Sequence, residues 1–233
     1  RIKHNWDLFL MNEHALRFDI SLLSKDKVSA TIADTNVQIG DGAITIGSNV
    51  NMDGVSLNTT NGPIYIDEGA TIMEGSMLRG PLYVGKNSVI KMGTKGYSNC
   101  SIGPKAKVGG EVNNVVFFGN CNKGHDGFLG NAVIGEWCNI GAGTDASNLK
   151  NDYGLVRVWD YTSGNFTKND LQFCGLMMGD YSQCAIQTTF NTATVIGVGC
   201  NLFGHGGRCS PSPYELLDCW FPCAVGSRAP RLR

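Results

Sequence analysis

Apolar residues recur along this chain at intervals of six positions. A run in one phase, interrupted at Gly96, comprises Ile66, Ile72, Leu78, Val84, Ile90, Ile102 and Val108. In most of these repeats a small residue follows four positions after the apolar one, as at Ala70 and Ser76. An amphipathic α-helix and a half-buried strand have much shorter periods, so neither produces this spacing. A six-residue repeat is typical of a parallel β-helix, in which short strands meet at tight corners around a narrow prism.

We therefore predict an all-β chain in which these apolar residues point into the prism. The repeat begins near Val28 or Ile32 and returns at Ile134 and Ile140. Its last phase comprises Met178, Cys184, Phe190, Ile196 and Leu202. From Asn148 to Phe173 the spacing disappears, which predicts an excursion from the helix, and long loops on rigid scaffolds often carry function. The predicted organisation is a segment 1–27, a β-helix 28–206 and an irregular tail 207–233.

The segment 1–27 differs from the repeat, because apolar residues such as Trp6, Leu8 and Leu16 are mixed irregularly with polar ones. This segment predicts one short amphipathic helix. It is either a linker from a missing upstream domain, in a chain that begins with Arg1, or a cap on the first open coil, whose main-chain groups would otherwise be unpaired. The tail contains cysteines and prolines without a repeat. We assign it no function and leave open whether it is the natural C-terminus.

Composition narrows the function classes. The 19 basic and 20 acidic residues give a net charge of −1, which predicts neither a nucleic-acid partner nor a membrane surface. No apolar stretch approaches the length of a membrane span, and no signal peptide is visible. The nine cysteines form no Cys-x-x-Cys pair, so a structural zinc site is not expected. We interpret those near repeat positions as reduced packing residues of a cytoplasmic protein: Cys100, Cys138, Cys184 and Cys200.

The segment between Gly109 and Gly143 contains three residues whose side chains could act in catalysis or substrate binding. Glu111 lies in Gly-Gly-Glu-Val, His125 in Asn-Lys-Gly-His-Asp-Gly-Phe-Leu-Gly, and Asn139 within a hexad. They are evenly spaced, at intervals somewhat shorter than the coil of about 18 residues in hexapeptide helices. If the corners are shortened, the three side chains come together on neighbouring coils.

The run Gly124–Ala132, with Ile134-Gly135, Asn139–Thr144 and Asn148, resembles the acetyltransferase half of the bifunctional N-acetylglucosamine-1-phosphate uridyltransferase/glucosamine-1-phosphate acetyltransferase family. The resemblance is closer to an alternative bacterial branch, which has Gly-Gly-Glu-Val and Asn-Leu-Lys-Asn-Asp-Tyr-Gly. It covers residues 5–206, and its most specific part is 109–154. It implies a left-handed β-helix, a homotrimer, acetyl-CoA as co-substrate and an amino-sugar 1-phosphate as acceptor. Members of this family normally carry a nucleotidyltransferase domain upstream, which this chain would lack, and Mg²⁺ would be needed only where that domain is present.

The resemblance also implies roles for individual residues. His125 corresponds to the catalytic histidine that takes a proton from the sugar amine, and Glu111 to a glutamate that orients it or holds the substrate. An imidazole suits such general-base chemistry at neutral pH. Two asparagines, Asn139 and Asn148, correspond to sugar contacts. Ala142 corresponds to a backbone contact with acyl-CoA, and the flanking residues that would allow this close approach are Gly141 and Gly143.

Two positions depart from the family. Phe128 stands where the bifunctional enzymes have tyrosine, and Asn113 stands where they have a phosphate-binding lysine. The candidates for the missing positive charge are Lys107, Lys123, Lys150 and Arg157. Without the resemblance, the asparagines are equally well explained as ladder or turn residues, and the lysines as surface residues.

The predicted function is acetyl transfer from acetyl-CoA to an amino-sugar 1-phosphate, in nucleotide-sugar and cell-envelope precursor synthesis. The alternative is a β-helix that serves only assembly and regulation of a sugar-1-phosphate nucleotidyltransferase. A carbonic-anhydrase-like β-helix would need three histidines around zinc, and the four histidines here are too scattered.

Overall fold

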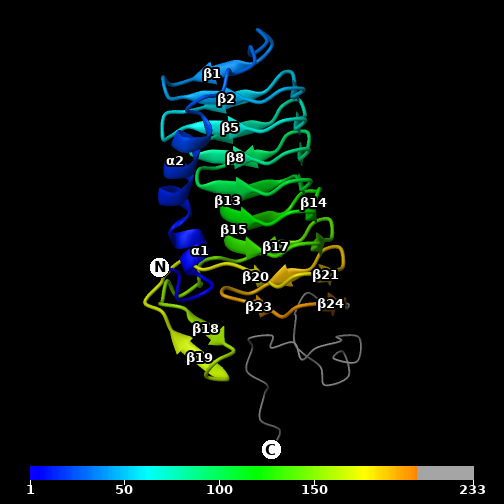
Figure 1. Ribbon diagram of the computed structural model, residues 1–233. Helices are drawn as coiled ribbons and strands as arrows, with labels where there is room; N and C mark the ends of the chain where they lie inside the picture. Colours follow the sequence, from blue (N-terminus) through cyan, green and yellow to red (C-terminus); the bar gives the residue numbers. More distant parts are fainter. Residues whose placement is uncertain (204–233) are drawn as a thin grey trace, which may run out of the picture.

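The computed structural model, which describes residues 1–203, is a parallel β-helix of about nine turns. Its short strands stack into a prism with three faces, and two helices lie along one side of it (Figure 1). The predicted fold class, an all-β left-handed parallel β-helix with a short helical N-terminal segment, is confirmed. The predicted tail 207–233 lies outside the described residues.

Most turns contribute a strand to each face. The first face contains β1 (Val37–Ile39), β4 (Ser56–Asn58), β7 (Met77–Arg79), β10 (Lys95–Gly96), the first halves of β13 (Glu111–Phe117) and β15 (Phe128–Ile134), β17 (Asp145–Ala146) and β22 (Thr189–Phe190). The second face contains β2 (Ile44–Ile46), β5 (Ile64–Ile66), β8 (Leu82–Val84), β11 (Cys100–Ile102), the second halves of β13 and β15, β20 (Met177–Met178) and β23 (Val195–Ile196). The third contains β3 (Asn51–Met52), β6 (Thr71–Ile72), β9 (Val89–Ile90), β12 (Lys107–Val108), β14 (Asn122–Lys123), β16 (Asn139–Ile140), β21 (Gln183–Cys184) and β24 (Asn201–Leu202).

The strand register gives the relative length of each coil. Ile66 pairs with Val84 and Val84 with Ile102, so these two coils are equal and each comprises three complete hexads. Ile102 then pairs with Phe117 and Phe117 with Ile134. The coil from Ile102 to Phe117 is half a hexad shorter than three hexads. The coil from Phe117 to Ile134 is one residue shorter than three hexads. These shortened coils explain why the six-residue phase is lost after Val108.

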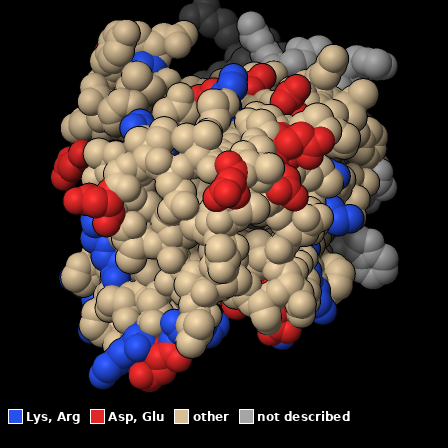
Figure 2. Space-filling view, turned by 90° about the horizontal axis from the view of Figure 1, so that it is seen from above, with Lys and Arg blue, Asp and Glu red and all other residues tan. Residues whose placement is uncertain are grey.

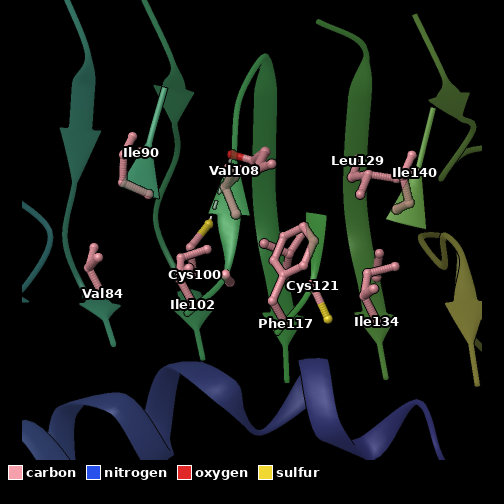
Figure 3. Close-up of a cluster of buried hydrophobic side chains, with 14 of the residues drawn as sticks. Val84, Ile90, Cys100, Ile102, Val108, Phe117, Cys121, Leu129, Ile134 and Ile140 are labelled. Atoms are coloured by element: carbon pink, nitrogen blue, oxygen red, sulfur yellow. Dashed lines mark hydrogen bonds between the residues drawn. The ribbon is translucent and has the colours of Figure 1, made fainter. Parts of the chain in front are cut away.

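The apolar side chains of successive coils meet inside the prism. Those labelled in Figure 3 point toward one another between the strands, with the N-terminal helices outside the core. Every residue of the predicted run is buried, which confirms the inward orientation. The interruption at Gly96 is also inward: a Cβ on Gly96 would lie 2.8 Å from Leu78 Cδ2. A neighbouring leucine therefore occupies the space that a side chain at position 96 would need.

Several cysteines also lie in this interior. Cys100, Cys138 and Cys184 are free and buried, as predicted. Cys200 is buried but is not among the free thiols, so the interpretation as a reduced cysteine does not extend to it. Burial raises the pKa of the Cys100 thiol to about 12, which keeps it protonated and unreactive.

The N-terminal segment forms two helices, α1 (Asp7–Leu10) and α2 (Asn12–Leu23), instead of the single predicted helix. They lie along the second face and do not cover the first coil as a cap would. Leu16 and Ile20 pack against the buried outward side chain of Tyr65. The Asn12 amide donates to Asn99 O at 2.6 Å, and its carbonyl accepts from the Ser101 hydroxyl at 2.7 Å. Apolar outward residues on this face give the helices a surface to bury.

The predicted excursion forms an antiparallel hairpin of β18 (Arg157–Asp160) and β19 (Asn165–Lys168). At the base of the excursion, Cys174 N donates to Asn148 O at 2.9 Å. The excursion therefore begins and ends close to the predicted limits, Asn148 and Phe173. Val156 and Val158 join Trp6 and Phe9 in a second apolar cluster. The excursion is therefore anchored to the N-terminal segment.

Charge is mixed on the end of the prism seen in Figure 2. Acidic side chains lie both in the middle of this end and at its rim, and basic ones lie mostly toward its rim. Within residues 1–203, no helix is long and apolar enough to cross a membrane.

Phe117 and Phe118 provide a matched test of the inward register. Phe117 is 2% exposed inside the prism, whereas Phe118 is 42% exposed at the following corner. Phe117→Ala should lower the free energy of unfolding by about 3–5 kcal/mol, because it leaves a cavity. Phe118→Ala should change it by about 0.5 kcal/mol or less. Urea unfolding followed by circular dichroism measures both, and equal losses would contradict the register.

Candidate functional site

His125 lies on a short corner, 124–127, which joins β14 on the third face to β15 on the first face. Its side chain is exposed. The preceding coil has only Gly109 and Gly110 at this edge, and the following coil has 141–144. We call the edge formed by these three corners the His125 edge.

Hydrogen bonds hold these corners together. Gly143 N donates to Asp126 O at 2.9 Å, and Gln187 N donates to Ala142 O at 2.7 Å. Adjacent coils are about 4.8 Å apart. The corner carrying His125 and the predicted acyl-CoA corner are therefore direct neighbours on the His125 edge.

Polar side chains of the third face lead to this edge. Lys107, Asn122 and Asn139 occupy successive outward positions, and Asn122 Nδ2 donates to Asn139 Oδ1 at 2.7 Å. Asn122, which we did not single out from the sequence, could have been found because it precedes Asn139 by one coil. This bond takes up the carbonyl of Asn139 but leaves its Nδ2 without a partner among the described residues.

The first face begins on the other side of the His125 edge. Glu111 and Phe128 are register neighbours there, and Phe128 N donates to Asp145 Oδ1 at 2.7 Å. Glu111 is half-buried. The structure thus brings Glu111, His125 and Asn139 to one edge, as their spacing predicts, because both intervening coils are shortened. It adds Asp145, which we did not single out.

The glycines of the edge are required by the stacking of the coils. A Cβ on Gly141 would lie 2.4 Å from the main chain of Ala185, and one on Gly127 would lie 2.1 Å from Thr144 O. Gly143 has a φ of +68°, which side chains disfavour. The sequence suggested that Gly141 and Gly143 admit a ligand, whereas the structure shows that packing alone already requires Gly141.

Asn148 lies across the first face from the His125 edge. Its Nδ2 donates to Asn131 Oδ1 at 2.8 Å. A Cβ on Gly130 would meet this nitrogen and the Phe128 ring at 2.6 Å each, so the ring and the amide flank Gly130. Phe128 therefore extends from the His125 edge toward Asn148.

The excursion forms a pocket of about 580 Å³ beside Asn148. Its lining includes Lys150, Arg157, Phe166 and Thr192. Lys150 Nζ lies 3.1 Å from the Asp152 carboxylate, and Arg157 Nη2 donates to Phe166 O at 3.0 Å. The hydrogen bond from the Gly154 amide, followed by Lys150, lowers the pKa of Asp152. These two predicted cations therefore belong to the excursion and not to the His125 edge.

Lys123, a candidate for the missing positive charge, lies inside the prism. It is 2% exposed and occupies an inward position in register with Val108. Its ammonium donates to Gly109 O at 2.8 Å and to His125 O at 3.0 Å. Burial lowers its pKa from 10.5 to about 8, although Asp126 and Asp145 act in the opposite direction. Of the three lysines that are candidates for the missing positive charge, Lys107 is the one exposed on the His125 edge.

In the part of the chain that the structure describes, no group of three or more histidine, cysteine, aspartate or glutamate side chains is placed to hold a metal ion.

No family model and no curated protein matches this chain. Among solved structures, it is similar to a UDP-N-acetylglucosamine acyltransferase from Arabidopsis, with 10% sequence identity over 72% of this chain and 71% of that chain. The TM-score is 0.20. A likeness this distant carries no argument about activity, so function has to be inferred from the residues themselves.

The buried ammonium of Lys123 predicts a specific pH dependence of stability. The pKa is 10.5 for an ordinary lysine and about 8 in the folded chain. Between these values the unfolded chain binds a proton that the folded chain does not, so stability from this group rises with pH. The rise should total about 3 kcal/mol.

Lys123→Met should lack this rise, and Lys107→Met, which removes an exposed lysine one coil away, should retain it. The measurement is the unfolding free energy of each protein between about pH 7.5 and about pH 10.5, compared as differences from the parent. A parallel course for the parent and Lys123→Met would mean that the ammonium is not buried.

Proposed function

We propose that this chain is an acyltransferase that moves an acetyl group from acetyl-CoA to the amine of an amino-sugar phosphate. The observation that carries the proposal is the His125 edge, where an exposed imidazole has Glu111, Asn139 and the 141–144 corner on neighbouring coils. The resemblance of 109–154 to hexapeptide-repeat acetyltransferases supports the same assignment.

In this proposal His125 acts as the general base. A protonated amine has no free electron pair, and imidazole accepts a proton at neutral pH. As the amine nitrogen attacks the thioester carbonyl, a C–N bond forms and the nitrogen proton passes to His125. The C–S bond then breaks, and His125 passes this proton to the CoA thiolate. Glu111, on the first strand after the preceding corner, would orient the imidazole or hold a sugar hydroxyl.

The acetyl-CoA would lie along the 141–144 corner. Gly141, Ala142 and Gly143 carry little side-chain bulk there. The Ala142 N–H has no acceptor among the described residues, whereas Gly143 N is already bonded to Asp126 O. An unpaired N–H is the kind of group that stabilises the negative charge developing on a thioester oxygen. Ala142 N is therefore assigned to the acetyl carbonyl.

The acceptor would bind over the coils that carry Asn139 and Phe128. Asn139 Nδ2 is available for a sugar hydroxyl, and Lys107 supplies positive charge on the same edge. Asn148, Lys150 and Arg157 lie across the first face. They would contact the acceptor only where it reaches across this face.

The exposed faces also support the proposed homotrimer. The second face is covered by α1 and α2, and the outward residues of the third face are mostly polar. The first face has exposed apolar residues, Ile39, Met77 and Tyr97, around a groove of about 390 Å³. Exposed apolar surface of this kind is commonly covered by association, and closed symmetry is its usual form. The part of the first face around Met77 is therefore assigned to contact between copies.

A second candidate, a β-helix used only for assembly and regulation of a sugar-1-phosphate nucleotidyltransferase, is favoured by two observations. Lys123 is buried, and Phe128 and Asn113 stand where the bifunctional enzymes that the sequence resembles have tyrosine and a phosphate-binding lysine. Fewer side chains then remain to bind the phosphate of an acceptor. In this case Mg²⁺ would act only in an upstream domain.

His125→Ala tests the catalytic proposal. It should lower kcat for acetyl transfer to glucosamine-1-phosphate by about 10²–10⁴-fold, the usual contribution of a positioned base. KM should change little, because proton removal matters in the transition state. Glu111→Gln should cost less.

The matched control is His14→Ala, which removes an exposed histidine of α2 far from the His125 edge. Steady-state kinetics with thiol release as the readout measures all four proteins. Parental turnover in His125→Ala would remove the base assignment, and no transfer by the parent to any amino-sugar phosphate would favour the assembly-only alternative.

The homotrimer is tested through Met77, which is 47% exposed on the first face. Light scattering should give three times the chain mass for the parent. Met77→Glu should shift the protein toward monomer, because it places a charge in an apolar contact. Val198→Glu, at an exposed corner between the second and third faces, should leave the mass unchanged. A monomeric parent at micromolar concentration would overturn the assembly assignment.

A further inference from the structure

Lys123 is a charged residue at a position that the fold reserves for apolar side chains. Its neighbours in register on the third face are Val108 in the preceding coil and Ile140 in the following one, both buried. Burying an ammonium is costly unless it is well paired. An apolar side chain would fit the prism at lower cost, so the amine must serve something that methylene groups cannot.

The shortened coil explains how the ammonium is accommodated. The corner between β12 and β13 has only Gly109 and Gly110, and it is shorter than most other corners at this edge. Gly110 has a φ of +73°, and a Cβ there would lie 2.9 Å from Lys123 Nζ. The shorter corner leaves a space inside this edge. The ammonium fills it and pairs with Gly109 O.

The second acceptor of the ammonium is the main chain of His125 itself. Lys123 Nζ donates to His125 O at 3.0 Å, from inside the prism. From the next coil, Gly143 N donates to the adjacent carbonyl, Asp126 O, at 2.9 Å. The corner 124–127 is longer than the Gly109–Gly110 corner of the preceding coil, so part of it has no corner residues to stack on. The hydrogen bond from Lys123 supports it there instead.

We propose that Lys123 is a positioning residue, whose ammonium fixes the corner that carries His125 against the shortened Gly109–Gly110 corner. This inference rests on the proposed function, because the consequence of the fixed corner is a fixed place for the His125 imidazole. Misplacement of a reacting group by about 1 Å can cost about 10²-fold in rate. Lys123 touches neither substrate nor co-substrate.

The charged groups facing the ammonium are Asp126 of the same corner and Asp145 of the following coil. A charge-assisted hydrogen bond is about twice as strong as a neutral one. Because the pKa of Lys123 is lowered to about 8, the hold on the corner weakens in mildly alkaline solution. The parent should therefore lose activity above about pH 8, and the loss should be absent without this amine.

The test uses Lys123→Met, which keeps the volume and removes the donors, with Lys86→Met, which removes an exposed lysine paired with Glu68, as the matched control. The full chain of each is assayed for acetyl transfer to glucosamine-1-phosphate, with kcat, KM and the pH profile as readouts. Lys123→Met should lower kcat by about 10–100-fold, with KM nearly unchanged and the alkaline decline lost. Lys86→Met should keep the parental kcat, KM and pH profile.

Amide hydrogen exchange provides a readout that does not depend on activity. In Lys123→Met, amides of 124–127 should exchange at least about 10-fold faster, while those of 141–144 change less. If Lys123→Met does not fold, Lys123→Gln, which keeps a neutral donor, replaces it and should show an intermediate loss of protection.

Parental kcat and parental exchange at 124–127 in either variant would overturn the proposal and leave Lys123 as a packing residue. A parent without acetyl transfer would instead refute the proposed function, and faster exchange in the variant would still show that Lys123 holds this corner.

Discussion

The pairing of main-chain groups between successive coils is the constraint on which the rest of this structure depends. Each strand is very short within a face, so stability comes from repeating the same register through the prism. The coils must therefore approach one another closely at every corner. Gly127 and Gly141, whose added Cβ atoms would collide with the neighbouring coil, show how strictly this spacing is kept.

The His125 edge is the place where this regularity is broken. Two successive coils are shorter than three hexads, the first more than the second, which draws Glu111, His125 and Asn139 onto neighbouring coils. The same shortening opens space inside the prism, and the amine of Lys123 occupies it. The shortened coils thus account both for the exposed residues of the His125 edge and for the buried ammonium of Lys123.

The N-terminal helices and the excursion divide the remaining surface. Helices α1 and α2 bury the apolar outward residues of the second face, and the excursion is anchored to Trp6 and Phe9. The first face keeps exposed apolar residues beside the groove at Met77, and it ends at the pocket lined by Lys150 and Arg157. A binding face is thereby left between the His125 edge and the excursion.

The sequence by itself determined the fold and its inward residues, because a six-residue period is matched by the coils of a β-helix and by neither a regular α-helix nor a flat strand. It also indicated the limits of the excursion and the placement of Glu111, His125 and Asn139 on neighbouring coils. It could not place Lys123, which falls outside the six-residue phase that Val108 follows. Whether a residue points inward after a shortened corner depends on the register between coils, and main-chain pairing in the folded protein decides that register. For the same reason, only the tertiary structure separated Lys107 on the His125 edge from Lys150 and Arg157 across the face.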